Sequence, residues 1–78
     1  MASDKDMRDH ILSLAIRNLK EMGRDNVDRN TIFTNTLHAR FFSEFLIANL
    51  SRGAQKDRVI NGLLNEIGER YRGAHHSN

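Results

Sequence analysis

The sequence lacks cysteine, proline and tryptophan, and it has only four phenylalanines and one tyrosine. Without cysteine there are no disulfides, no thiolate metal sites and no cysteine nucleophile. Few aromatic residues, together with abundant Leu, Ile, Ala, Arg, Asn and Glu, favour helices over a sheet. A chain of 78 residues buries only about 60% of its unfolded surface, so it needs either an efficient helical core or an oligomer.

Long hydrophobic runs are also missing. No apolar stretch approaches the ~20 residues that a membrane-spanning helix needs, so we expect no membrane association. The segment from Met1 to Asp6 is acidic and unlike a signal peptide. We therefore expect a cytoplasmic protein.

Apolar residues recur at helical intervals in three segments. The predicted helices are 4–22, 35–50 and 55–71. Ser3 is a suitable amino-terminal cap for the first helix, and Gly23 follows it in the favoured stop position. Thr34 caps the second helix, which closes near Gly53.

Residues 24–35 are rich in side chains that hydrogen-bond their own backbone, and they predict a connector with one short helical turn begun at Asp28. Residues 1–72 then form a single helical domain, and 73–78 form a flexible tail. The predicted fold is all-α: a small three-helix bundle, completed by dimerisation.

Two of the predicted helices carry unusually wide apolar faces. At about 100° per residue, the apolar side chains cover roughly 200° of 4–22 and 220° of 35–50, against roughly 140° of 55–71. Either the connector covers the second side of the middle helix, or a second copy does. We favour a homodimer, because large exposed apolar patches mark interaction sites. The expected self-interface residues are Leu12, Ile16, Phe42, Leu46 and Leu50.

The third predicted helix contains two interior glycines, Gly62 and Gly68. Each costs ~1 kcal/mol relative to alanine in a helix. Two explanations remain open: another backbone approaches closely there, or the helix kinks or ends near Gly68.

The formal charge is +2, with nine arginines among the twelve basic residues. Acidic and basic residues nearly balance at both ends of an up-down-up bundle. Four pairs lie one helical turn apart and support their helices: Asp4–Arg8, Arg17–Glu21, Arg40–Glu44 and Glu66–Arg70. The arginines expected to contact an acidic patch on a partner protein are Arg24, Arg29, Arg52 and Arg58.

A helix-turn-helix is the alternative. A turn around Ile32 would be its first helix, and the helix beginning near residue 35 would read DNA. Its expected base-contacting residues are Asn35, Thr36, His38, Arg40 and Ser43. The same helix is strongly apolar, however, and no uncompensated basic stripe suits a phosphate backbone. A dimeric DNA-binding regulator therefore ranks second.

No motif specifies a reaction, a metal or a cofactor. His10 and His38 are isolated, and Asp6 with His10 makes only two of the ligands that a metal site needs. In size and composition alone, the chain is similar to small accessory proteins of phages and plasmids, many of which bind and modulate one host protein. The sequence therefore predicts a non-enzymatic, homodimeric protein-binding modulator or inhibitor.

Overall fold

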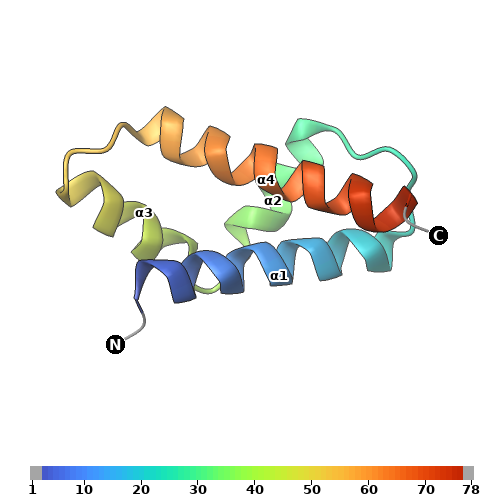
Figure 1. Cartoon of the computed structure of the whole chain (residues 1–78), viewed down its shortest axis with the longest axis horizontal. Helices are drawn as coiled ribbons and strands as arrows, with labels where there is room; N and C mark the ends of the chain where they lie inside the picture. The colour runs from blue at the N-terminus through green and yellow to red at the C-terminus, as the bar shows by residue number, and fades with distance from the viewer. Residues whose placement is uncertain (1–2, 77–78) are drawn as a thin grey trace.

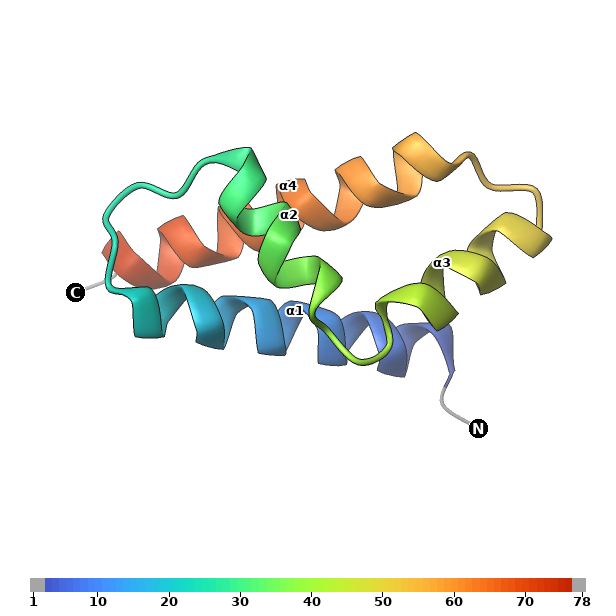
Figure 2. The same ribbon diagram turned by 180° about the vertical axis from the view of Figure 1, so that it is seen from behind.

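The computed structural model describes residues 3–76 of the chain. These residues form four helices and no strand: α1 (Asp4–Met22), α2 (Arg29–Leu37), α3 (Phe42–Ser51) and α4 (Lys56–His76). The two long helices, α1 and α4, lie side by side and run in the same direction, and α2 and α3 return the chain between their ends (Figures 1 and 2). The all-α class is confirmed, but the chain has four helices rather than three.

Helix α1 has the predicted bounds because both of its ends are capped. The Ser3 hydroxyl accepts a hydrogen bond from the Asp6 backbone N–H at 3.1 Å. At the other end Gly23 adopts φ +67°, a left-handed conformation that glycine takes without strain, and its N–H donates to the Lys20 carbonyl. These two caps fix where the connector begins.

The connector and the second predicted helix differ from expectation. The predicted short turn is a nine-residue helix, α2, whose cap is Asp28 as expected, with its carboxylate accepting from the Thr31 N–H at 2.8 Å. The predicted continuous helix over 35–50 is broken at residues 38–41. Its first part belongs to α2 and its second part is α3.

The break has a packing cause. In a continuous helix, Phe42 and Phe45 would lie roughly 80° and 140° around the axis from Ile32. The turn at 38–41 instead lets all three side chains face one core. The buried Thr36 hydroxyl donates a hydrogen bond to the Ile32 carbonyl at 2.8 Å. Bonds of this kind bend helices, so Thr36 favours the break that follows it.

Helix α1 is the centre of the core. It lies against α2, α3 and α4, and its side chains Ile11, Leu12, Ala15 and Leu19 are completely buried. The wide apolar face of this helix is therefore covered by three neighbours within one chain. No second copy is required to bury it.

Helix α4 runs to His76, five residues beyond the predicted end at Tyr71. Residues 73–76 of the predicted tail are thus helical, and 77–78 lie outside the described residues. Gly68 neither ends α4 nor meets another backbone: a Cβ there would lie 3.5 Å from the Ile32 side chain and 3.3 Å from that of Arg72. Its buried site lets Ile32 of α2 pack closely against α4.

We predict that Phe42→Asp unfolds the chain. Phe42 is 5% exposed and belongs to the core of the single chain, so a carboxylate there should cost more than about 3 kcal/mol. Urea titration followed by far-UV circular dichroism measures the loss. Ser43→Asp places the same charge on the neighbouring exposed position and should leave the midpoint nearly unchanged; equal midpoints for the two variants would contradict the packing of Phe42.

A candidate protein-binding surface

Three of the four large, strongly exposed apolar side chains lie on the two short helices. Leu37 is 50% exposed, Ile47 65% and Leu50 37%, and the fourth is Met22 at the end of α1. Residues 44, 47 and 50 stand one turn apart on α3, so Glu44, Ile47 and Leu50 form one exposed row that we call the α3 ridge. The ridge therefore exposes two large apolar side chains beside one carboxylate.

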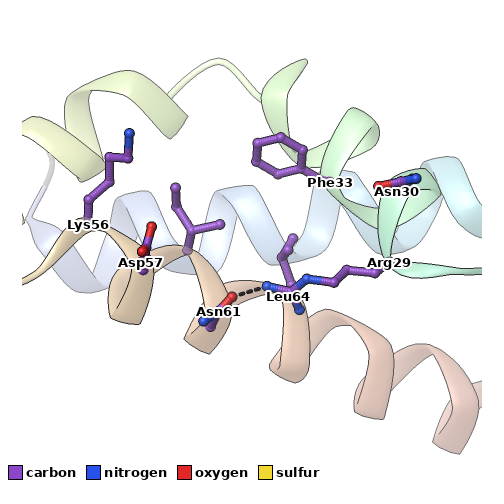
Figure 3. A pocket seen from close by; sticks show the side chains of 8 residues that line it. Arg29, Asn30, Phe33, Lys56, Asp57, Asn61 and Leu64 are labelled. Atoms are coloured by element: carbon purple, nitrogen blue, oxygen red, sulfur yellow. Dashed lines mark hydrogen bonds between the residues drawn. The ribbon is translucent and has the colours of Figure 1, made fainter.

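A groove of about 320 Å³ lies between α2 and the first half of α4 (Figure 3). Apolar side chains of both helices, Phe33, Ile60 and Leu64, line it. Its polar lining residues are Arg29, Asn30, Lys56, Asp57 and Asn61. An apolar surface with a few polar groups around it is the usual form of a binding site. We call it the α2–α4 groove.

The charge of the groove is positive. Arg29 and Lys56 line it against the single carboxylate of Asp57. The Arg29 guanidinium hydrogen-bonds the Asn61 side-chain oxygen, which links α2 to α4 across the groove (Figure 3). Beyond Leu64 a smaller hollow continues along α4 and adds Arg72. The groove therefore suits an acidic ligand with apolar side chains.

The α3 ridge and the groove lie on different helices, since the residues that line the groove belong to α2 and α4. Leu37 follows Phe33 by one turn of α2, so it extends the same apolar face toward α3. Phe41, just before α3, turns toward α1, where its ring meets His10 edge-on at 5.0 Å. Leu50 lies roughly 180° around α3 from Phe41, away from α1. On the same count Ile47 lies roughly 120° and Glu44 roughly 60° from Phe41, so it is the apolar end of the ridge that points away from the α1 contact.

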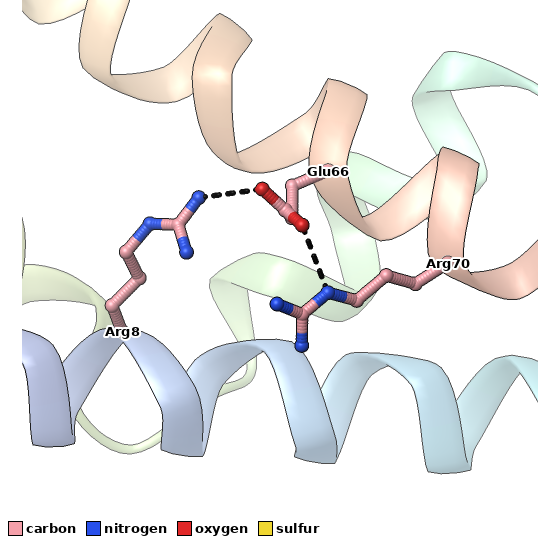
Figure 4. A network of polar contacts seen from close by, with 3 residues as sticks. All are labelled: Arg8, Glu66 and Arg70. Carbon is pink, nitrogen blue, oxygen red and sulfur yellow. Dashed lines mark hydrogen bonds and ion pairs between the residues drawn. The ribbon is translucent and has the colours of Figure 1, made fainter.

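On another side of α4, a polar network joins this helix to α1 (Figure 4). Glu66 accepts from Arg8 of α1 at 2.9 Å and from Arg70, one turn later on α4, at 2.8 Å. The pair Glu66–Arg70 was predicted; Arg8 pairs with Glu66 rather than with Asp4, which instead pairs with Arg52. The two guanidinium groups lower the pKa of Glu66 below its ordinary 4.5.

The predicted self-interface residues separate into two groups. Leu12 and Phe42 are buried in the core of the single chain, so neither is available to a second copy in this conformation. Ile16 and Leu46 are partly buried against that core, and Leu50 is exposed. Sequence reasoning missed Ile47, although it lies roughly 200° around α3 from the buried Phe45.

The predicted partner-binding arginines do not form one patch. Arg29 lines the groove, and Arg24 is exposed near Asp28 at the end of α1. Arg52 is engaged by Asp4, which ties the α3–α4 connection to the start of α1. Arg58 is exposed, and it forms no ion pair with any described residue.

The predicted DNA-contacting residues are spread over α2, the turn and α3. Thr36 is completely buried, and Asn35 donates to the Thr31 carbonyl. His38 ends α2, and Ser43 is an exposed residue of α3. The Arg40 guanidinium lies 5.3 Å from the centre of the Phe41 ring. The five side chains therefore do not share one helix face.

Comparisons with known proteins give no assignment: no family model, no curated protein and no solved structure matches this chain. Over the described residues, no cluster of three or more His, Cys, Asp or Glu side chains could hold a metal ion. In the same part of the chain, no helix has the length and apolar character to cross a membrane. The surface described above is thus the basis for a functional proposal.

We predict that Glu66→Gln weakens the fold at neutral pH and that its effect fades in acid. Because Arg8 and Arg70 hold the folded-state pKa of Glu66 below 4.5, the carboxylate stabilises the chain above that value, and the contribution is lost as pH falls through the lowered pKa. Urea unfolding at pH 7 and about pH 3 should show a gap between wild type and variant that narrows in acid. The control is Glu69→Gln, which makes the same change at an exposed carboxylate of the same helix. A stability difference between wild type and Glu66→Gln of equal size at both pH values would contradict the network.

Proposed function

We propose that this chain is a small, non-enzymatic protein-binding modulator that acts as a homodimer. The observation that carries the proposal is the exposed apolar ridge on α3, in a chain whose α2–α4 groove carries two cations against one acid. Contiguous exposed apolar surface on a small protein marks a site of association.

The self-interface is proposed at the α3 ridge rather than at the core side chains. Ile47 and Leu50 expose apolar surface that would leave water on association, at a gain of about 25 cal/mol per Å². Leu46, which is partly buried, lies roughly 40° around α3 from Leu50 and widens the apolar area. Cyclic dimers are the commonest closed assemblies of a single chain, so one such ridge per chain suits a two-fold pair.

The arginines outside this interface are proposed to recognise the partner protein. Arg24 and Arg58 are exposed and carry guanidinium groups that bind carboxylates in a planar, two-pronged geometry. A partner with an acidic patch is the corresponding target. Binding of that kind would modulate the partner by occupying its surface, as an accessory or inhibitor protein does.

A DNA-binding regulator is the second candidate, and one observation favours it: helices of nine and ten residues, α2 and α3, are joined by the short turn 38–41. Helix-turn-helix motifs have such lengths. The exposed residues of α3, however, are Ser43, Glu44, Ile47, Leu50 and Ser51. With an acid and no cation among them, this face fits a protein surface better than a phosphate backbone.

We predict that Ile47→Asp abolishes dimerisation and leaves the helices intact, because the side chain is exposed and lies outside the core. Sedimentation velocity at micromolar concentrations should show a dimer for wild type and a monomer for the variant, with unchanged circular dichroism. Ser13→Asp adds the same charge to an exposed position of α1 and should remain dimeric. A monomeric wild type, or a dimeric Ile47→Asp, would contradict the proposal.

Affinity capture on the tagged chain from a host lysate, with and without nuclease, tests the partner. We expect a stoichiometric protein band that survives nuclease and weakens when Arg24 and Arg58 are both changed to Glu, because reversed charge repels an acidic patch. Lys20→Glu with Arg17→Glu makes the same charge change on α1 and is the control. Nucleic acid in the eluate, with companion proteins lost on digestion, would instead establish the second candidate.

A further inference from the structure

We infer that in the dimer the α3 ridge of each copy occupies the α2–α4 groove of the other, so that the two contacts are reciprocal. This inference rests on the proposed homodimer and specifies how it is built. The ligand of the groove is then a second copy of this chain.

The two surfaces are chemically complementary. The ridge offers Ile47 and Leu50 with the carboxylate of Glu44, and α3 contains no basic residue. The groove offers three apolar side chains together with two cations and one acid: Phe33, Ile60, Leu64, Arg29, Lys56 and Asp57. Glu44 forms no ion pair with any described residue of its own chain. An acidic apolar helix in a basic apolar groove satisfies both surfaces.

The groove cations stand where their own helices do not favour them. Arg29 is the first residue of α2, and Lys56 is the first residue of α4. The amino-terminal end of a helix carries partial positive charge, so a cation there costs some tenths of a kcal/mol and an acid would be preferred. Arg29 is held by its hydrogen bond to Asn61, whereas Lys56 forms no ion pair with any described residue and is available to a carboxylate brought by another chain.

The placement of ridge and groove allows the assembly to close. The groove lies on the side of α4 and α2 away from α1, which runs behind them in Figure 3, and Leu50 of the ridge points away from the α1 contact of Phe41. A two-fold axis through this side of the molecule brings the ridge of each copy to the groove of the other. Both surfaces of both copies are then buried in one closed dimer. If ridge and groove lay on opposite sides, the same contact would repeat without closing and would build a filament.

The groove fits a polypeptide better than a nucleic acid. Its lining combines three apolar side chains with two cations and one acid, a net charge of +1 that suits a single carboxylate better than a phosphate backbone. Binding of a single strand without sequence preference relies on exposed rings for stacking. Phe33, the aromatic side chain in the lining, is itself partly buried against the core. The ridge of a second copy brings two apolar side chains and one carboxylate, which match this lining in chemistry.

A charge exchange between two variants tests the reciprocal contact. The groove variant is Arg29→Glu with Lys56→Glu, and the ridge variant is Glu44→Lys; all three positions are exposed. Each variant alone places like charges at both contacts, so self-association should weaken about tenfold or more. An equimolar mixture places opposite charges at both contacts, and a heterodimer should form with about the wild-type dissociation constant.

Sedimentation velocity measures self-association of each variant and heterodimer formation in the mixture. One variant carries a fluorescent label so that the mixed dimer can be distinguished. The controls are Arg17→Glu with Lys20→Glu for the groove variant and Glu21→Lys for the ridge variant, which make equal charge changes on α1. Both controls should dimerise like wild type. Adding a 20-base single-stranded DNA should leave wild-type sedimentation unchanged.

The possible outcomes separate this inference from the proposed function. A mixed dimer formed by two variants that do not self-associate supports the reciprocal contact. A dimeric wild type whose groove and ridge variants also dimerise would overturn the contact and leave the homodimer standing. A wild type that is monomeric at all concentrations would overturn both. Binding of the DNA that is lost in the groove variant would assign the groove to nucleic acid.

Discussion

The fold depends on covering helix α1. More than half of the circumference of this helix is apolar, and a chain of 78 residues must cover it with short elements. Helix α4 covers one side along its length, and α2 and α3 cover the rest, each reaching α1 at a different point. That arrangement requires the chain to change direction between α2 and α3, which the turn at 38–41 accomplishes.

The same turn creates the exposed surface. Phe42 and Phe45 point into the core. A residue two positions further along a helix lies on nearly the opposite side, so Ile47, which follows Phe45 by two positions, points outward. The groove is the space left where α2 diverges from the first half of α4. The ridge and the groove therefore result from the way in which α1 is buried. Their apolar residues are those that the core does not cover.

The sequence alone predicted the all-α class, the caps at Ser3, Asp28 and Gly23, and the parallel course of the first and last helices. It did not predict the break at 38–41, because no glycine or proline marks it and the apolar pattern continues across it. The break depends on tertiary packing, which outweighs local propensity. For the same reason Phe42 was placed at an interface, while Ile47 was missed.

In the proposed dimer, a second copy covers the apolar surface that the core leaves on α3 and in the groove. A dilution series of ¹H–¹⁵N correlation spectra tests it directly, because amide shifts report each residue separately. The account predicts concentration-dependent shifts at Glu44, Ile47 and Leu50 and at Phe33 and Ile60, with the outer face of α1 unchanged. Shifts centred on that face of α1, or no shifts at any concentration, would contradict it.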